Sequence, residues 1–574
     1  MHKYIMVAGG SISGIGKGVC TASLGKILQQ CGYKVTAIKI DPYINVDAGT
    51  MRPTEHGECW VTHDGGETDQ DLGTYERFLN IDIPFKNSIT TGQIYQTVIE
   101  QERAGKYLGK TVQFIPHIID EIKRRIKVAA EGSEITLVEI GGTVGDYENI
   151  PFFFAMKSLE RDGNDVAYAL VSYLPVPSHL GEMKTKPTQQ AIKMLSETGI
   201  FPDLVFCRGY APLDEVRKQK IETYANMPPG SVIAAPDTNC IYAVPLELEP
   251  EELAKKVLQR LKLPPPEVKN WDQWKTLIKN IRSPQQRIKV AVVAKYLNSG
   301  DYSLVDSYLS VKEALVHAGA QLNIGIDIDW LSATDLEEEK NIERLQSYAG
   351  IIVPGGFGSS GVEGKINAIR FARTKKKPFL GLCYGLQLAV VEYARNVCGW
   401  DAHTTEVAQT AYSVVDILPT QQQLLNEKKI GGTMRLGEYA AELYPQSKVL
   451  QLYQETNRLQ EDQERLSHIE PQRLGKTKGI LILEKHRHRY EVQPQFVEQL
   501  EQAGLSFSGK HLREDGISLV EFLELPQHPF FLATQAHPEL KSRLGNPAPL
   551  FYGFVKACAE NSKQLSNNNF INSS

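Results

Sequence analysis

Three side chains in the C-terminal half of this sequence have the types and settings needed to hydrolyse an amide. Cys383 lies in GLCYGLQ (residues 381–387), after an apolar run that predicts a strand and before a helical pattern. This sharp turn exposes a nucleophile at a helix N-terminus, where the helix dipole favours the thiolate. His537 and Glu539 stand two residues apart, so Glu539 can orient the imidazole that acts as base. We expect a Cys-His-Glu triad.

A glycine-rich turn supplies a candidate oxyanion site in the same half. VPGGFG (residues 353–358) follows a second apolar run, and its glycines let backbone N–H groups approach a developing negative charge. Taken separately, these features are equally compatible with a core cysteine, a capped histidine and an ordinary turn. Their occurrence together in one alternating strand and helix pattern favours catalysis.

A second Gly-rich segment, GGSISGIGKG (residues 9–18), leads from the first apolar run into an amphipathic helix. Its backbone N–H groups and the helix dipole can point at phosphates, and Lys17 can reach the terminal ones. The spacing departs from the standard phosphate loop, because five residues separate Gly10 from Gly16 and Gly18 replaces the usual Ser or Thr. An ordinary Gly-rich turn is the alternative interpretation.

Because Gly18 has no hydroxyl group, Mg²⁺ must find its oxygen ligands elsewhere. Asp71, in DGGETDQDLG (residues 64–73), and Glu139, at the carboxyl end of an apolar run, are the candidates. A charge that ends a buried strand is costly unless it is paired or metal-bound, and strand ends are where such sheets bind ligands. The alternatives are a salt-bridged structural carboxylate for Glu139 and a solvated acidic turn for Asp71.

The segment KTKPTQ (residues 184–189) places two lysines beside hydroxyl and amide groups. That composition suits a triphosphate and its sugar. Two lysines on a loop belong to a solvated surface more often than not, so this segment alone is a weak signal.

The elements that position these residues form two series of alternating apolar runs and helical patterns. Runs that are apolar on both faces predict parallel strands covered by helices on both sides, so we expect an α/β protein with two doubly wound, mainly parallel-sheet domains. The three consecutive prolines, two tryptophans and many charges of residues 264–286 predict a linker. The expected organisation is a first α/β domain at 1–263, a second α/β domain at 287–560 and a disordered Ser/Asn-rich tail at 561–574.

The composition excludes several classes of protein. At 574 residues, with 42% hydrophobic and 23% charged residues, the chain reads as a soluble globular protein of two or three domains. A net charge of −5 gives no support for binding to nucleic acid or an anionic membrane. No apolar stretch approaches the about 20 residues of a membrane span, and the N-terminus lacks a signal-peptide layout. Eight cysteines without a Cys-x-x-Cys pair fit a reducing compartment, so we expect a cytoplasmic protein.

Taken in order along the chain, the motifs resemble those of the CTP synthase family. The strings that carry the resemblance are GGSISGIGKG, KIDPYINVDAGTM, HGE, DGGETDQDLG, TTGQIY, EIGGTVGD, GEMKTKPTQ, VPGGFG, GGTMRLG and HRHRYEV. The first half resembles a P-loop-like, dethiobiotin-synthetase-like domain and the second a class I glutamine amidotransferase. The resemblance implies a ligase of pyrimidine biosynthesis, in which ATP phosphorylates the 4-oxygen of UTP and ammonia from L-glutamine displaces the phosphate to give CTP.

The resemblance also implies roles for individual residues. Cys383, His537 and Glu539 match the catalytic triad, and Mg²⁺ would be held by Asp71 and Glu139. ATP would be bound by Gly14, Ile15, Gly16, Lys17, Gly18, Val19, Lys39, Asp71, Pro236, Asp237 and Thr238. UTP or the feedback inhibitor CTP would be bound by Ser13, Asp146, Tyr147, Glu148, Lys184, Thr185, Lys186, Pro187, Thr188, Gln189 and Lys220. Glutamine would be bound by Gly356, Tyr384, Gly385, Leu386, Gln387, Glu406 and Arg489.

The family further implies GTP as an allosteric activator and a homotetramer, with filaments in some members. Two other interpretations stay open at this point. One is a related glutamine-dependent ATP ligase that acts on a carboxylate, against which GEMKTKPTQ and KIDPYINVDAGTM argue. The other is a filament or scaffold protein that has lost the chemistry, against which the intact candidate catalytic residues argue.

Three departures from the family pattern affect these expectations. Residues 455–479 are a polar insertion relative to bacterial forms, which we expect to be a surface excursion near the glutamine site that is dispensable for chemistry. Extra residues follow Tyr296, with Leu309 where some members carry lysine, which affects the GTP site. Around the amidotransferase motifs, the usual Met, Phe and Phe are replaced by Leu386, Val407 and Leu540.

Overall fold

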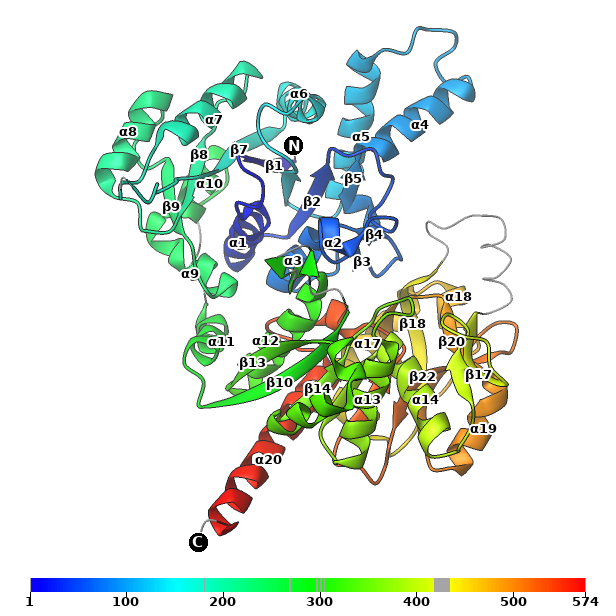
Figure 1. The fold of residues 1–574 in the computed structure, drawn as a ribbon. Helices are drawn as coiled ribbons and strands as arrows, with labels where there is room; N and C mark the ends of the chain where they lie inside the picture. The colour runs from blue at the N-terminus through cyan, green and yellow to red at the C-terminus, as the bar shows by residue number, and fades with distance from the viewer. Residues whose placement is uncertain are drawn as a thin grey trace. The chain divides into compact units, whose positions relative to one another are not determined.

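The computed structural model describes residues 2–572, apart from 180, 266, 268–269, 296–297, 300–301, 304 and 418–433. The chain forms two compact units (Figure 1). Unit 1 comprises Met1–Ala48 and Thr68–Ile278, and unit 2 comprises Gly49–Glu67 and Lys279–Ser574. The segment Gly49–Glu67 therefore folds with the C-terminal unit, although it lies far from that unit in the sequence.

Unit 1 is built on a seven-stranded sheet in which every strand pairs in parallel. The strand runs are almost continuously buried; all six residues of the central strand β6, for example, are buried. The carboxyl ends of parallel strands meet at one edge, so this topology gathers the loops that carry the predicted nucleotide residues. In sheet order the strands are β5 (Ser88–Thr90), β2 (Val35–Asp41), β6 (Ile135–Ile140), β1 (Lys3–Gly9), β7 (Asp165–Tyr173), β8 (Leu204–Gly209) and β9 (Val232–Pro236).

Helices connect the strands of unit 1, as the parallel pairing requires. These connecting helices are α1 (Lys17–Gln30), α3 (Gln70–Leu79), α4 (Thr91–Arg103), α5 (Ile119–Ala130), α6 (Ile150–Arg161), α7 (Lys186–Glu197) and α8 (Glu215–Ala225). Helices α9 (Val244–Glu247) and α10 (Leu253–Arg260) follow the last strand. The expected linker region contains helix α11 (Asp272–Arg282).

Unit 2 is built on a nine-stranded sheet that is mixed rather than wholly parallel. Its first five strands pair in parallel and its last four add antiparallel. Alternate residues of β10 enter two different hydrophobic clusters, Ala291 and Val293 on one face and Val290 and Val292 on the other, so both faces are covered. In sheet order the strands are β13 (Ile324–Ser332), β10 (Gln286–Ala294), β14 (Gly350–Val353), β15 (Phe379–Leu382), β23 (Phe531–Thr534), β22 (Ser518–Glu524), β21 (Ser506–Leu512), β18 (Arg435–Leu443) and β19 (Ile480–His488).

The smaller elements of unit 2 complete its surface. A three-stranded sheet contains β16 (Ala402–Thr404), β17 (Tyr412–Ile417) and β20 (Tyr490–Val492), and Gly49–Glu67 carries α2 (Pro53–His56) and β3 (Trp60–Val61). The helices of the C-terminal part are α12 (Leu309–Leu322), α13 (Val362–Thr374), α14 (Tyr384–Asn396), α16 (Lys448–Glu455), α17 (Arg458–Arg465), α18 (Pro471–Leu474), α19 (Pro494–Gln502) and α20 (Pro549–Asn572). The two α/β domains expected from the sequence are thus present.

The last helix differs from the expected disordered tail. Helix α20, red in Figure 1, continues through residues 561–572, and Ser573 and Ser574 lie outside the described residues. The Asn561 side chain donates a hydrogen bond to the carbonyl oxygen of Ala349 at 3.0 Å. Extending an existing helix needs no new nucleation, which explains why a polar tail can remain helical.

The 455–479 insertion also differs from the loose surface excursion expected for it. Helix α17 buries Asp462 completely and leaves Arg458 only 5% exposed. Beyond α17, Arg473 donates hydrogen bonds to the carbonyl oxygens of His63 (3.2 Å), Asp64 (2.8 Å) and Leu436 (3.0 Å). Hydrogen bonds and ion pairs of its charged side chains hold the insertion against the rest of unit 2, and Leu459 packs against a hydrophobic cluster there.

Among the described residues, no helix combines the length and apolar character needed to cross a bilayer.

Candidate active sites

Cys383 lies at a strained turn between strand β15 and helix α14. Its backbone has φ 50° and ψ −100°, a conformation that residues other than glycine rarely adopt. Helix α14 starts in close contact with β14, because a Cβ on Gly385 would lie 2.1 Å from the carbonyl oxygen of Val353. The turn therefore presents the thiol at the N-terminus of a helix, as the sequence predicted for a nucleophile.

His537 and Glu539 form a buried pair beyond the end of strand β23. The Nδ1 atom of His537 is 2.7 Å from Oε1 of Glu539, and both side chains are largely buried. Burial lowers the pKa of His537, but the charges of Glu539 and Cys383 raise it more, so that this pKa stands well above its ordinary value. Among the described residues, the buried Nε2 atom has no hydrogen-bond partner, which leaves it available for proton transfer.

The predicted oxyanion turn lies against these groups. A Cβ added to Gly355 would be 3.0 Å from Cε1 of His537 and 3.8 Å from Cβ of Cys383, so only glycine allows this close approach. Lys365, which the sequence analysis missed, is fully buried and donates to the carbonyl oxygen of Pro354 at 3.0 Å. Because a peptide is planar, fixing this carbonyl also fixes the direction of the Gly355 N–H group.

Lys365 is an unusual group to find behind a reactive turn. Burial, followed by the charge of Lys295, lowers the pKa of Lys365 to about 7. The ammonium group lies 5.6 Å from the ring centroid of Tyr384. In the sequence, Lys365 lies in the helical pattern VEGKI (residues 362–366), which gives no sign that this lysine is buried.

A cavity of about 520 Å³ in unit 2 opens onto Cys383, His537 and Glu539. Five of the residues predicted to hold glutamine line this cavity: Gly356, Tyr384, Gln387, Glu406 and Arg489. The other two are placed differently. Leu386 packs in the hydrophobic core, and Gly385 is the close-contact position at the start of α14.

Polar groups are well distributed around the cavity. The carboxylate of Glu406 accepts a hydrogen bond from the Gly358 N–H at 2.7 Å, and burial raises the pKa of Glu406. The side chain of Gln387 donates to the carbonyl oxygen of Tyr490 at 2.9 Å. A cavity that combines apolar walls with a few polar groups suits a small ligand that carries both charges, such as an amino acid.

Residues of the segment Gly49–Glu67 line the same cavity, which the sequence analysis did not anticipate. Gly49, Glu58 and Cys59 contribute to its wall, and Arg487 forms an ion pair with Glu67 at 2.8 Å. The string HGE (residues 56–58) was the only sequence signal for this segment, and it did not indicate that Glu58 lies near Cys383.

In unit 1 the Gly-rich loop joins strand β1 to helix α1, and Lys17 begins that helix. Gly16 adopts a left-handed conformation (φ 84°) as the helix N-cap. The Lys17 ammonium group donates to the carbonyl oxygen of Gly142 at 2.8 Å, and burial lowers the pKa of Lys17 against the raising effect of Glu139. The loop, helix and lysine thus have the arrangement of a phosphate site.

Lys39 is the centre of a charged cluster at the ends of strands β2 and β6. Its ammonium group pairs with Asp41 (3.2 Å), Asp69 (3.3 Å) and, most closely, Asp71. Burial opposes the charge of Lys39, yet these carboxylates raise its pKa well above the ordinary value. Asp69 also caps helix α3 by accepting from the Asp71 N–H, which holds Asp71 in the first turn.

Glu139 faces the same cluster from the end of β6. It accepts a hydrogen bond from the Tyr75 hydroxyl at 2.6 Å. Burial, together with the nearby Asp71 carboxylate, raises the pKa of Glu139 to about 7. A Cβ on Gly18 would lie 2.3 Å from Oδ1 of Asp71, so this glycine is required by the approach of that carboxylate. The structure therefore brings Lys17, Lys39, Asp71 and Glu139 together.

The carboxylates at this edge suit a hard cation. Mg²⁺ prefers oxygen ligands and is usually bound through one or two carboxylates together with phosphates. Asp71 and Glu139 supply such oxygens, and burial, together with the neighbouring Asp71 carboxylate, is what raises the pKa of Glu139. No group of three or more His, Cys, Asp and Glu side chains in the described part of the chain forms a metal site by itself.

The remaining predicted nucleotide residues are spread over neighbouring loops of unit 1. Ser13 and Lys220 are exposed, Lys184 pairs with Glu182 at 2.8 Å, and the hydroxyl of Thr188 is buried against Ser172 at 2.9 Å. Thr185, Lys186, Pro187 and Gln189 surround the start of α7. In the loop after β6, the Asp146 carboxylate accepts a hydrogen bond from the Thr143 N–H at 2.7 Å. Tyr147, which is 87% exposed, and Glu148 lie in the 3₁₀ turn that follows.

Residues 236–238, which the resemblance assigns to the adenine of ATP and which we call the adenine segment, lie at the end of strand β9. Pro236 ends the strand, the Asp237 carboxylate pairs with Arg208 at 2.8 Å, and the Thr238 hydroxyl donates to the carbonyl oxygen of Cys240 at 3.4 Å. A Cβ on Gly16 would lie 3.4 Å from Nε of Arg208, so this arginine bridges the Gly-rich loop and the adenine segment. The sequence analysis missed Arg208, whose only signal was its place near the end of a buried strand.

The fold and the site of unit 2 define a glutamine amidotransferase. Residues 303–557 match the family model described as glutamine amidotransferase class-I. Residues 3–263 match the model described as CTP synthase N-terminus. The chain belongs to the CTP synthase family.

Similar proteins cover almost the entire chain. A CTP synthase from Pyrococcus furiosus is 47% identical over 98% of this chain and 98% of its own length, and one from Thermococcus gammatolerans is 46% identical over 98% and 99%. A solved structure of the Trypanosoma brucei CTPS glutaminase domain with bound acivicin shares 32% identity over 48% of this chain and 94% of that chain, with a TM-score of 0.40.

Proposed function

We propose that this chain is a glutamine-hydrolysing CTP synthase, an ATP-dependent ligase that aminates UTP with ammonia from L-glutamine. The observation that carries the proposal is the presence of two complete sets of reacting groups, one in each unit. Unit 2 contains Cys383, His537 and Glu539 on one cavity, and unit 1 contains the cluster around Lys17 and Lys39. Family membership over nearly the whole chain supports the pairing.

In unit 2, Cys383 would attack the carboxamide carbon of glutamine. His537 would accept the thiol proton and deliver it to the departing ammonia, while Glu539 holds the imidazole by the 2.7 Å contact. The Gly355–Gly356 backbone, braced through Lys365 and Pro354, would stabilise the oxyanion. Water then releases glutamate from the acyl-enzyme.

In unit 1, Lys17 and the N-terminus of α1 would hold ATP phosphates, and Lys39 would face the transferred group. Mg²⁺ held by Asp71 and Glu139 would neutralise phosphate charge when bound. The other predicted contacts to ATP, UTP and CTP at residues 13–19, 146–148, 184–189, 220 and 236–238 belong to the same proposal. Ammonia would then displace the phosphate on the 4-oxygen of UTP.

The finer assignments extend this proposal. They are activation by GTP, feedback inhibition by CTP, assembly as a homotetramer with possible filaments, and a cytoplasmic location. Part of the region after Tyr296 that bears on GTP lies outside the described residues. The domain limits 1–263, 264–286 and 287–560 are proposed with them.

One assay tests the proposal directly. Purified protein is incubated with UTP, ATP and Mg²⁺, with either glutamine or an ammonium salt, and CTP formation is followed by its rising absorbance. We expect CTP from both nitrogen sources, and glutamate release only with glutamine. A folded protein that forms no CTP from ammonia would overturn the assignment of unit 1.

A further inference from the structure

The polar insertion lies directly behind the candidate catalytic pair. Lys541 ends the 3₁₀ turn η10 (Pro538–Lys541), which begins one residue after His537 and contains Glu539. The Lys541 side chain is only 2% exposed. A buried ammonium group of this kind needs partners, and helix α17 of the insertion supplies one of them.

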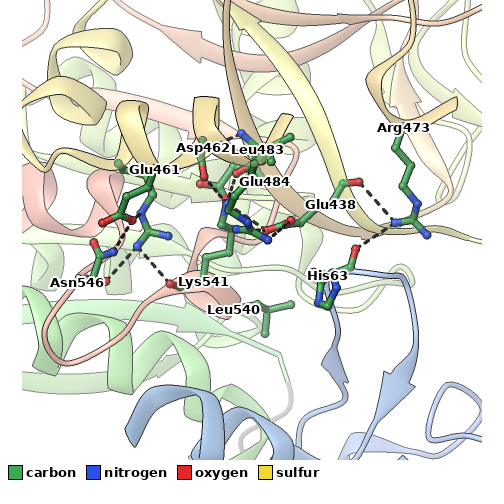
Figure 2. A network of polar contacts seen from close by, with 12 residues as sticks. His63, Glu438, Glu461, Asp462, Arg473, Leu483, Glu484, Leu540, Lys541 and Asn546 are labelled. Carbon is green, nitrogen blue, oxygen red and sulfur yellow. Dashed lines mark hydrogen bonds and ion pairs between the residues drawn. The ribbon is translucent and has the colours of Figure 1, made fainter. Parts of the chain in front are cut away.

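Asp462 connects the insertion to Lys541 (Figure 2). One oxygen of its carboxylate is 3.0 Å from the Lys541 ammonium group, and the other accepts from the Leu483 N–H at 3.0 Å. The Lys541 ammonium group also contacts Glu438 at 3.2 Å and the carbonyl oxygen of Leu483. Lys541 is thus tied to α17, β18 and β19 at once.

Helix α17 also holds the backbone of the segment that follows the turn. Arg458 donates to the carbonyl oxygens of Lys541 (3.4 Å) and Asn546 (3.1 Å), and the Asn546 side chain donates to Glu461 at 2.6 Å. Farther along the helix, Arg465 pairs with Glu438 at 2.7 Å. Figure 2 shows Asp462 and Glu438 beside Lys541, and Glu461 beside Asn546.

Glu539 needs support of this kind. Its Oε1 atom bonds to His537, but its buried Oε2 atom has no hydrogen-bond partner among the described residues. No second hydrogen bond therefore orients this carboxylate, and its direction follows from the backbone of the η10 turn. The contacts that fix this turn at Lys541 consequently bear on the His537–Glu539 geometry.

We propose that helix α17 of the insertion is a positioning element for glutamine hydrolysis, with Asp462 and Arg458 acting through Lys541 on the Glu539–His537 pair. This inference rests on the proposed function of Cys383, His537 and Glu539. It replaces the expectation that the insertion is dispensable for chemistry. Asp462 and Arg458 are positioning residues and touch no reacting atom.

The test compares Asp462→Asn with Glu464→Gln, the same chemical change at an exposed carboxylate of the same helix. We expect D462N to lower the kcat for glutamate release by about tenfold or more, with a change in glutamine KM of no more than about threefold. The alkaline limb of its pH profile should move to lower pH, because a misaligned Glu539 supports the His537 imidazolium less well. E464Q and ammonia-dependent CTP synthesis should stay within about twofold of wild type.

Two further variants separate positioning from a general loss of structure. The double variant D462N/K541Q also removes the ammonium group through which Asp462 acts, and we expect it to lose no more glutaminase activity than D462N. Arg458→Lys keeps the Asp462–Lys541 pair but weakens the backbone contacts, and a smaller fall in kcat of about threefold is expected. Unchanged kcat and pH profile in folded D462N, or additive losses in the double variant, would overturn the inference. Absence of glutamate release by the wild type would instead refute the proposed function.

Discussion

The proposed glutamine site of unit 2 and the proposed phosphate site of unit 1 use charged groups in opposite ways. In unit 2 the reacting groups are held against one another, with His537 bonded to Glu539 and Cys383 fixed at a strained turn. In unit 1 the lysines already bond to other groups of the protein. Lys39 pairs with three carboxylates, and Lys17 donates a hydrogen bond to the Gly142 carbonyl oxygen.

The difference indicates how each site meets its substrate. The glutamine site has its working geometry before substrate arrives, as electrostatic preorganisation requires. In the proposed phosphate site, Lys17 and Lys39 already bond to groups of the protein, so a phosphate would compete with these partners. The predictions below test this contrast, beginning with the largest expected effect.

Replacing Cys383 with Ala should lower glutamine-dependent CTP synthesis by about 10⁴-fold or more, because the nucleophile is lost. Synthesis from a high concentration of ammonia should continue, because unit 1 contains its own reacting groups. Both rates are measured by CTP absorbance, with thermal unfolding as the control for folding. Loss of both activities in a folded variant would contradict the division into two sites.

Replacing Lys17 with Ala should produce the opposite pattern. CTP synthesis from either nitrogen source should fall by about 10²-fold to 10³-fold, because a positioned charge on the transferred phosphate is removed. Glutamate release should persist, since Cys383 and His537 are untouched. If the variant makes CTP from ammonia at a near-normal rate, the Gly-rich loop is only a structural turn.

Replacing Glu539 with Gln should lower glutamine hydrolysis by about 10²-fold, less than His537→Ala, because orienting a base contributes less than being one. The Glu539 charge raises the pKa of His537, so its removal lowers that pKa. The imidazolium that protonates the departing amino group is then lost at lower pH, so the alkaline limb of the glutaminase pH profile should shift to lower pH. An unshifted limb would show that Glu539 has no electrostatic role.

The smallest effect is expected on stability, from Lys365→Met. Burial, then Lys295, lowers the pKa of Lys365 to about 7, so above that pH the unfolded chain binds the proton more strongly than the folded chain does. Wild-type stability should therefore rise between about pH 7 and 9, by up to about 1.4 kcal/mol per pH unit from this group. The variant should lack that rise in urea unfolding. Parallel pH dependences would indicate that Lys365 is hydrated.

The sequence predicted the fold class and the residues that meet at each site, because strand ends and Gly-rich turns leave clear local signals. Lys17, Asp71 and Glu139 follow from the parallel sheet, and Cys383 with His537 follows from two strand ends of the second sheet. Individual assignments to ATP, UTP, CTP and glutamine stay predictions.

Other features depend on long-range contacts that no local pattern contains. Lys365 and Arg208 resemble ordinary surface residues until the fold buries or surrounds them. The insertion was judged by its few apolar side chains, whereas Asp462 is anchored to a lysine 79 positions away. The tail beyond residue 561 was judged by composition, although it continues a helix that is already formed.

The backbone at Cys383 has a consequence for how this chain evolves. A left-handed, strained residue costs about 1–3 kcal/mol, a considerable part of the 5–15 kcal/mol by which domains are usually stable. Selection for stability alone would favour glycine at this position, and glycine would end the chemistry. The cysteine is therefore retained at a cost in stability, and its replacement by glycine is expected to give a more stable but inactive protein.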